Sequence, residues 1–347
     1  MFMRALTWFL CIFSIIATSL PFIQTSLWWV RIFDFPRVQI AIISLIAFLL
    51  SLKYIGGKRL TQIVFSSLTA ISFLYQVSQV IVYTSIYPVQ TKMSTADAEK
   101  NTFSLLVANV LMSNQQASAF KKQVFQYQPD IILITEPNQW WAEQLKELDT
   151  AYSYFIKHPL ENTYGMILYS KFPLTNEQVN FLVDKDVPSF FAKITLPSGK
   201  AFDFYGVHPK PPRPGNSSEE RDTEILIIGK KIRERQRSAL VAGDLNDVGW
   251  SSTTTRFQKY SRLGDPRQGR GLFNTYNAHI PFLRYPLDHI FYSDDFGLIN
   301  IDKLDNTGSD HFPIFIELSY EPTKDNIKKL PELDSSDKEI IEEKIEN

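Results

Sequence analysis

Residues 239–246 read Ala-Leu-Val-Ala-Gly-Asp-Leu-Asn, a short apolar run that stops at a cluster of Gly, Asp and Asn. Two other apolar runs stop in the same way at Asn109 and Glu136, and a further polar cluster, Ser-Asp-His, occupies residues 309–311. An Asp or Asn after a strand is first of all a turn residue, so one such transition carries little weight. Their recurrence along the chain predicts strands whose ends gather acids, amides and histidines.

The segment 102–320 has the pattern of an α/β domain. Helical spacing predicts a helix over Ala117–Tyr127, and Ser217 with Glu220 offers a capping box for a helix that runs to about Arg235. Short apolar runs predict strands at Phe103–Ala108, Ile131–Thr135, Gly165–Ser170, Phe190–Leu196, Phe202–Val207, Ala239–Ala242, Leu287–Tyr292 and Phe312–Leu318. Strands outnumber helices, which favours mixed sheets covered by helices on their outer faces.

The first 90 residues differ sharply in composition from the rest. The charged side chains up to Pro88 are Arg4, Arg31, Asp34, Arg37, Lys53, Lys58 and Arg59. Three apolar windows are near the ~20 residues that cross a bilayer: roughly Leu6–Val30, Val38–Tyr54 and Gln62–Tyr83. A cleaved signal peptide explains the first window less well, because the stretch is long and two more windows follow. We expect an anchor of three transmembrane helices over 1–90 and a linker over 91–101. Because the middle window is the shortest, a re-entrant or interfacial segment is an alternative to a membrane-spanning helix there.

Basic residues beside the spans set the expected orientation. With the amino terminus inside, four of them face the cytoplasm and three face outside: Arg4, Lys53, Lys58 and Arg59 against Arg31, Arg37 and Lys92. Three spans then export the rest of the chain. We therefore expect an integral protein of the inner or plasma membrane with its α/β domain outside the cytoplasm. The single cysteine, Cys11, excludes a disulfide within one chain and says nothing about the compartment.

The charge is unevenly distributed. The net charge is −1, and the first 90 residues carry six basic side chains against one acidic, so the remainder is acidic. Residues 321–347 hold nine acidic and five basic side chains, which predicts a charged tail that is either a solvated helix or flexible. A mildly acidic domain does not favour a processive grip on duplex DNA, since that grip depends on Lys and Arg.

The polar residues at the strand ends suit hydrolysis of a phosphoester. A hard cation such as Mg2+ takes one or two carboxylates and keeps several waters, and Glu136 is the best candidate ligand. Asn109 could hydrogen-bond the Glu136 carboxylate or touch the metal directly. Asp244 can act as general base or orient the attacking water, and Asn246 can donate to a phosphate oxygen. The two histidines His208 and His311 would donate to the non-bridging oxygens.

These motifs resemble the endonuclease/exonuclease/phosphatase superfamily, deoxyribonuclease I-like, and this chain looks like a membrane-anchored bacterial-type member. The resemblance runs from about Thr102 to Tyr320. It rests on Asn109-Val110, Glu136, Gly165-Met166-Ile167-Leu168-Tyr169-Ser170, Tyr205-Gly206-Val207-His208, Gly243-Asp244-Leu245-Asn246, Leu287-Asp288-His289-Ile290-Phe291 and Ser309-Asp310-His311.

The resemblance implies a four-layer α/β sandwich, two mixed β-sheets flanked by helices, and a set of site residues. Glu136, Asn109 and Asp310 would lie at the metal, which would be Mg2+ or Mn2+. The catalytic residues would be His208, Asp244, Asn246, Asp288 and His311, with Asp288 orienting His311. Neighbours in an extended segment point opposite ways, so Asp310 is poorly placed to hold His311, and His289 should point away from the site. Leu111 stands where some relatives carry an acid.

The sequence therefore predicts a membrane-anchored, Mg2+-dependent phosphoesterase. Nucleic acid, phospholipid head groups and small phosphate esters all stay open as substrates, because the loop Tyr276–Tyr285 contains both apolar residues and Arg284. The alternative is a catalytically silent receptor or scaffold with the same fold. A transport role is weaker, since we expect no buried charge in the spans. No motif indicates an obligate protein partner, and beyond the substrate the expected partner is the lipid bilayer.

Two further sets of residues match no motif. His158 and His279 are interpreted as loop residues. Arg267, Arg270 and Arg284 are interpreted first as solvated charges, with a role as substrate clamps as the alternative.

Overall fold

The computed structural model describes residues 1–95, 101–322, 326–327, 330 and 332–346. The chain divides into two compact units, Met1–Tyr87 with Pro212–Ser218, and Pro88–Pro211 with Glu219–Asn347. The expected linker 91–101 lies partly outside the described residues, as does part of the expected tail.

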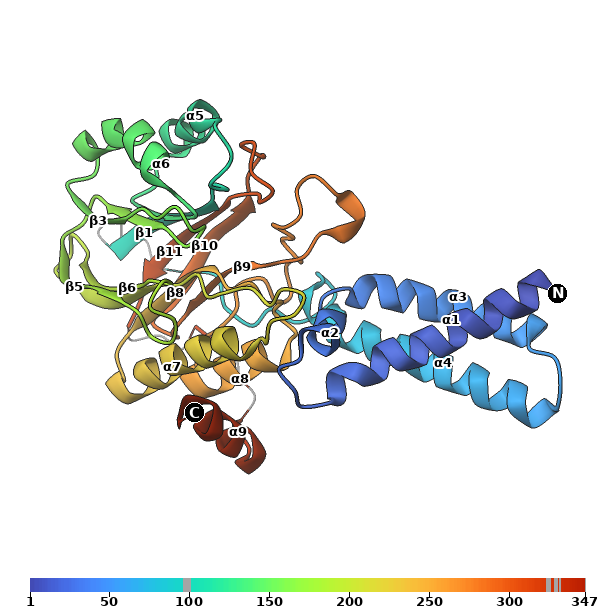
Figure 1. Cartoon of the computed structure of the whole chain (residues 1–347). Helices are drawn as coiled ribbons and strands as arrows, with labels where there is room; N and C mark the ends of the chain where they lie inside the picture. Colours follow the sequence, from blue (N-terminus) through green and yellow to red (C-terminus); the bar gives the residue numbers. More distant parts are fainter. Residues whose placement is uncertain (96–100, 323–325, 328–329, 331, 347) are drawn as a thin grey trace. The chain divides into compact units, whose positions relative to one another are not determined.

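The first unit is a bundle of three long helices, α1, α3 and α4, which pack against one another (Figure 1). Three segments are long and apolar enough to cross a membrane, judged by length and composition: Phe2–Phe22, Arg37–Tyr54 and Arg59–Tyr83. The elements of this unit are α1 (Phe2–Ser19), η1 (Leu20–Phe22), α2 (Trp28–Arg31), η2 (Ile32–Asp34), α3 (Arg37–Tyr54), α4 (Arg59–Val80) and η3 (Ile81–Tyr83).

The first predicted span, Leu6–Val30, is wrong in its extent. Helix α1 ends at Ser19, and a 3-10 turn follows that contains Pro21. A proline lacks the backbone N–H and disfavours helical geometry in the residue before it, so the apolar run cannot continue as one helix. Residues Trp28–Arg31 then form the separate short helix α2.

The expectation of no buried charge among the spans is also corrected. Arg31, Asp34 and Arg37 are all buried, and each arginine lies 2.9 Å from a different carboxylate oxygen of Asp34. The amide oxygen of Gln76 accepts from Arg37 over 3.3 Å. These charges lie in the α2–η2 turn and at the first residue of α3, and they neutralise one another in part.

The second unit contains two β-sheets. Their strand orders are β10-β11-β1-β2-β4-β3 and β5-β6-β7-β8-β9, and each sheet mixes one parallel pair with antiparallel pairs. The strands are β1 (Thr102–Asn109), β2 (Ile131–Thr135), β3 (Tyr154–His158), β4 (Met166–Ser170), β5 (Leu174–Asn180), β6 (Ser189–Thr195), β7 (Ala201–Gly206), β8 (Ala239–Asp244), β9 (Asp288–Tyr292), β10 (Phe296–Lys303) and β11 (Ile314–Tyr320).

Helices cover the outer face of each sheet, so the unit has four layers (Figure 1). Along β1, Leu105 and Val107 point into the core between the sheets, while Leu106 and Ala108 point outward under a helix layer. Both faces are buried, which explains why the strands read as continuous apolar runs. The helices and 3-10 turns are α5 (Ala117–Tyr127), α6 (Gln139–Gln144), η5 (Lys146–Thr150), α7 (Glu219–Arg235), α8 (Ser252–Ser261), η6 (Pro281–Leu283) and α9 (Ser335–Glu346). The four-layer sandwich predicted from the sequence is confirmed.

The helix α9 lies in the charged tail. Ile341 is fully buried, and Asp337 contacts Arg256 over 3.1 Å and Lys259 over 2.6 Å. The helix packs on α7, where Lys344 pairs with Glu219 over 2.7 Å. Of the two forms expected for the tail, these residues adopt the helix, with its apolar side covered.

Candidate active site

The two sheets bring their polar strand ends to one edge. Strands β1 and β2 run parallel, and β11 is antiparallel to β1, with Val107 paired to Ile314. In the other sheet β8 is antiparallel to β9, and Asp244 is paired directly with Asp288. The carboxyl ends of β1, β2 and β8 therefore meet the amino ends of β9 and β11. This edge collects the predicted residues from both sheets.

Asn109, the last residue of β1, connects the two sheets. Its amide nitrogen donates to Glu136 Oε1 over 2.8 Å and to Asp244 Oδ2 over 3.1 Å. Its amide oxygen accepts the backbone N–H of Leu111 over 3.0 Å. The oxygen is thus already used, and the nitrogen faces both carboxylates. Of the two roles expected for Asn109, this geometry supports holding Glu136 through a hydrogen bond.

Glu136 sits in an unusual backbone conformation. Its φ is 64°, in the left-handed region that a non-glycine residue enters at a cost. The turn is held because the Glu136 N–H donates to the carbonyl of Gly165 over 2.9 Å, and a Cβ on Gly165 would lie 1.9 Å from the carbonyl oxygen of Pro137. The carboxylate is only partly buried, and its Oε2 lies 3.5 Å from the N–H of Met112. Glu136 therefore keeps lone pairs that can serve a cation.

Asp244 ends β8 close to His208 because the preceding residue is glycine. Gly243 has φ of 139°, and a Cβ there would lie 1.9 Å from the carbonyl oxygen of Val207. Asp244 is 1% exposed, and its Oδ1 accepts the N–H of Asn246 over 2.9 Å. The amide nitrogen of Asn246 donates to the carbonyl of Pro209 over 3.0 Å, which uses one of its two N–H groups. The other N–H forms no hydrogen bond with any described residue.

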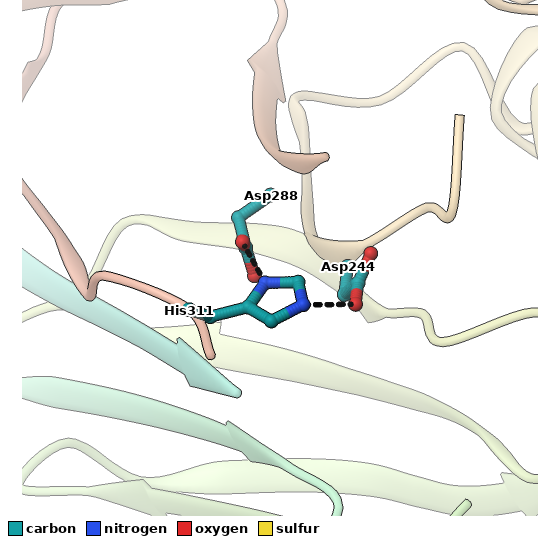
Figure 2. Close-up of side chains that lie close together, drawn as sticks. All are labelled: Asp244, Asp288 and His311. Carbon is teal, nitrogen blue, oxygen red and sulfur yellow. Dashed lines mark hydrogen bonds and ion pairs between the residues drawn. The ribbon is translucent and has the colours of Figure 1, made fainter. Parts of the chain in front are cut away.

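His311 lies between two carboxylates (Figure 2). Its Nδ1 is 2.7 Å from Asp288 Oδ2, and its Nε2 is 3.5 Å from Asp244 Oδ2. Burial alone lowers the pKa of His311, but the charges of Asp288 and Asp244 outweigh burial and raise it to about 10. The raised pKa favours the protonated ring, whose Nδ1 donates to Asp288 and whose Nε2 is paired with Asp244.

His208 and Asp288 each hold a buried atom that has no hydrogen-bond partner within the described residues. The Nε2 of His208 lies 3.8 Å from Asp244 Oδ2, while its Nδ1 has no such partner, and Asp288 Oδ1 has none either. Buried polar atoms are normally paired, so unpaired ones at such an edge fit a site that receives a polar ligand.

Asp310 is placed less directly. Its carbonyl accepts the N–H of Ala278 over 2.7 Å, and its Oδ1 lies 3.5 Å from the hydroxyl of Ser309. Within the described part of the chain, the Asp310 carboxylate forms no ion pair with a cationic side chain. The Ser309 hydroxyl also donates to the carbonyl of Asn109 over 2.7 Å, which fixes the Ser-Asp-His loop to the end of β1.

Sequence reasoning missed the network behind the site. The Nδ1 of His289 accepts from Arg267 over 2.7 Å and its Nε2 donates to the carbonyl of Asp247 over 2.8 Å, since a guanidinium only donates and a carbonyl only accepts. Burial, reinforced by the charge of Arg267, holds the pKa of His289 well below its usual range. Arg221 donates to the carbonyl of Asn246 over 2.8 Å. These side chains fix the loop after β8 from the side away from the site.

Arg267 is therefore neither a solvated charge nor a substrate clamp, the two roles that the sequence suggested. It is 1% exposed, pairs with Asp265 over 2.7 Å and donates to the carbonyl of Asp288 over 3.3 Å. The Asp-Pro-Arg spacing of residues 265–267 was the available signal, but a local pair of opposite charges is common on solvated loops.

A divalent cation fits the carboxylate oxygens at this edge of the sheets better than it fits the close group of Asp244, Asp288 and His311. Asp244, Asp288 and His311 bring ligand atoms within 4.8 Å of one another. A metal ligand must be a deprotonated nitrogen, however, and both nitrogens of His311 face carboxylates. Within these three residues, Asp288 is hydrogen-bonded to His311, and Asp244 forms an ion pair with the other nitrogen of the ring. The partly exposed carboxylate of Glu136 is the better oxygen ligand for a hard cation.

Comparisons with known proteins agree with the geometry. A sequence model of the Endonuclease/Exonuclease/phosphatase family matches residues 106–311. No curated protein sequence matches the chain.

Several solved structures share the fold. D. rerio TDP2 complexed with single strand DNA product is 17% identical, with a TM-score of 0.54, covering 63% of this chain and 99% of its own. The human nocturnin catalytic domain with bound sulfate anion is 18% identical, with a TM-score of 0.52 and coverages of 64% and 95%. A family protein from Bacteroides thetaiotaomicron is 18% identical, with a TM-score of 0.52 and coverages of 66% and 98%. At these identities the likeness establishes the fold alone.

Proposed function

The chain belongs to the endonuclease/exonuclease/phosphatase family, and on this premise we propose that it hydrolyses a phosphodiester or phosphomonoester by attack of water assisted by Mg2+ or Mn2+. The family is generally dependent on divalent metal. The observation that carries the proposal is the position of His311 between Asp288 and Asp244 at the edge where both sheets end.

The imidazolium of His311 is a preorganised donor for a phosphate oxygen. Negative charge develops on the non-bridging oxygens as water attacks phosphorus, and fixed donors stabilise that charge. Asp288 holds the ring through Nδ1, and Nε2, which lies 3.5 Å from Asp244 Oδ2 without a hydrogen bond, can donate to a phosphate oxygen once the phosphate enters. The remaining N–H of Asn246 extends the same donor set, and the unpaired Nδ1 of His208 adds a further polar atom that a ligand can contact.

Asp244 is the group that handles the proton of the attacking water. Its Oδ1 is held by the Asn246 N–H, and its Oδ2 faces Asn109, His208 and His311. A carboxylate fixed in this way can orient a water and accept its proton. Removing the negative charge by Asp244→Asn would keep the shape and remove this capacity.

Glu136 would hold the cation, with Asp310 close by in the loop that carries His311 and Asn109 holding the Glu136 carboxylate. When bound, the cation would supply Lewis-acid polarisation of a phosphate oxygen. The chain's own contribution is to keep Glu136 in its strained turn, aimed at the edge of the sheets.

We further propose that the three apolar helices anchor the chain in a bilayer with the second unit outside the cytoplasm. Their length and composition support this, and the excess of basic residues at the expected cytoplasmic ends supports the orientation. A silent receptor with the same fold is less consistent with the site, because every side chain that the chemistry needs is present.

The test uses the detergent-solubilised full chain, incubated with DNA, RNA, phospholipids and small phosphate esters, with and without EDTA. We expect hydrolysis of at least one class, lost with EDTA and restored by Mg2+ or Mn2+. Wild-type protein that is folded and metal-loaded but hydrolyses none of them would contradict the proposal.

A further inference from the structure

The loop Tyr276–Tyr285 carries three large apolar side chains that are open to solvent. Ile280 is 44% exposed, Phe282 is 84% exposed and Leu283 is 45% exposed. We call these three residues the apolar tip. Single exposed apolar residues are ordinary, but a contiguous group beside a candidate catalytic residue marks a place where an apolar partner binds.

The base of this loop is fixed to the candidate active site. Tyr276 pairs in β-bridge fashion with both Tyr285 and His311, and its ring centroid lies 4.9 Å from that of His311. The N–H of Ala278 donates to the carbonyl of Asp310 over 2.7 Å. The apolar tip is therefore carried on a short loop whose base is bound directly to the Ser-Asp-His segment.

Two cationic side chains lie next to the same segment. The ring of Phe312, the residue after His311, has the Lys303 ammonium 4.0 Å and the Arg284 guanidinium 4.9 Å from its centroid. Arg284 belongs to the loop Tyr276–Tyr285, and it also donates to the carbonyl of Ala278 over 3.1 Å, which links the two ends of the loop. Lys303 is exposed, and within the described part of the chain its ammonium forms no hydrogen bond or ion pair.

We infer that this arrangement selects a membrane phospholipid as the substrate of the proposed phosphoesterase. The apolar tip would contact the acyl chains, Lys303 would contact the lipid phosphate region, and the scissile phosphoester would enter the edge that holds His311. The inference rests on the proposed function and names its substrate class. A solvent-exposed Phe, Leu and Ile beside a basic side chain matches the order of an amphiphile, apolar tail next to anionic head.

Charge and tethering favour lipid over nucleic acid. Nucleic-acid binding draws its strength from many Lys and Arg side chains on phosphates, and the chain after the first 90 residues is acidic overall. The three candidate spans would in addition keep lipid at a high effective concentration around the second unit.

The experiment compares long and short acyl chains on the same head group. The full chain in detergent micelles is given phosphatidylglycerol and phosphatidylethanolamine, each as the dioleoyl and the water-soluble dihexanoyl lipid. A single-stranded oligonucleotide and bis(p-nitrophenyl) phosphate are assayed beside them. The readout is the ratio of kcat/KM on long-chain lipid to kcat/KM on short-chain lipid. We expect wild-type protein to prefer at least one long-chain lipid.

The variant Phe282→Ser should lower this ratio by about tenfold or more, because the apolar surface that a phenylalanine buries against an acyl chain is lost. The matched control is Phe125→Ser, an equally drastic change at a 54% exposed phenylalanine on α5, and it should leave the ratio within about twofold. Lys303→Ala should raise KM for the long-chain lipid, with Lys200→Ala as its exposed control.

Failure of the inference is separable from failure of the proposed function. A wild-type protein that hydrolyses bis(p-nitrophenyl) phosphate in a metal-dependent way, but shows no long-chain preference or prefers the oligonucleotide, would overturn the lipid inference alone. An equal fall of the ratio in Phe282→Ser and Phe125→Ser would overturn it too. Wild-type protein that hydrolyses no phosphoester would overturn the function itself.

Discussion

The Nδ1 of His311 lies 2.7 Å from Oδ2 of Asp288, while the neighbouring Asp310 turns its backbone toward a different loop. Residues 310 and 311 are adjacent, so their side chains leave an extended segment in opposite directions. The partner of the histidine therefore comes from the other sheet. This single contact couples the loop before β11 to the start of β9, and it makes His311 a fixed cation between two carboxylates.

The Asp288→Asn variant tests that coupling. An asparagine of the same shape retains a weaker hydrogen bond but no longer stabilises the imidazolium, so we expect kcat to fall by about a hundredfold. Steady-state kinetics on the best small ester measures this. The exposed Asp186→Asn is the control, and it should stay within about twofold of wild type. An unchanged kcat in Asp288→Asn would show that the pairing plays no part in turnover.

Glu136→Gln tests the cation site without an activity assay. The wild-type chain should gain thermal stability when Mn2+ or Mg2+ is added, because an ion that binds only the folded state stabilises it. Loss of the carboxylate charge should abolish most of this gain. Differential scanning fluorimetry in detergent gives the shift, and Glu177→Gln, an exposed glutamate on β5, is the matched control. A full metal-induced shift in Glu136→Gln would place the cation elsewhere.

Gly243→Ala tests why Asp244 can stand beside His208. The added Cβ would meet the carbonyl oxygen of Val207 at 1.9 Å, and φ is 139°, so two backbones must separate. We expect a loss of about 3 kcal/mol or more in the free energy of unfolding. Gly199→Ala also has a positive φ, of 80°, but meets no atom within 4 Å, and backbone strain alone should cost it about 1 kcal/mol. Equal losses in the two variants would remove the steric explanation.

Glu224 gives the second unit a defined pH dependence. It is buried in α7, accepts a hydrogen bond from Ser189, and burial raises its pKa from 4.5 to about 8. Between pH 4.5 and about pH 8 the folded chain binds more protons at Glu224 than the unfolded chain does. The contribution of Glu224 to the free energy of unfolding therefore falls as the pH rises. Glu224→Gln should lose less stability than wild type from about pH 5 to pH 8, as measured by thermal unfolding across that range. Identical slopes for both proteins would contradict the assignment.

The sequence predicted the interior strands and the edge strand β9, but missed the other edge strands. The range Ile131–Thr135 and the helix Ala117–Tyr127 coincide with β2 and α5, because buried central elements are apolar throughout or follow helical spacing. The three missed strands, β3, β5 and β10, all lie at sheet edges. One missed strand reads Leu-Thr-Asn-Glu-Gln-Val-Asn, and its side chains are mostly exposed, so no apolar run marks it. Helix α8 was missed because three threonines open it.

The candidate site shows the same division. Residues that end strands, such as Asn109 and Asp244, can be predicted from the sequence because a polar side chain follows an apolar run. The structure brings these two side chains together. The side chains that hold these residues in place have no such pattern in the sequence. His289 and Arg267 meet across 22 positions of sequence, and only the pairing of β8 with β9 brings them behind the site. Long-range contacts of this kind follow from tertiary packing, which periodicity alone does not encode.

The most direct measurement is kcat for hydrolysis of bis(p-nitrophenyl) phosphate by the full chain in Mg2+, for wild type, Asp244→Asn and His311→Ala. Thermal unfolding should show that both variants are folded, and both should lose about a hundredfold or more in kcat. His158, predicted to lie in a loop, is instead the last residue of strand β3, beside Phe181, and His158→Ala should keep wild-type kcat. Near-wild-type turnover by folded Asp244→Asn or His311→Ala would contradict the account that this edge of the sheets cleaves phosphoesters.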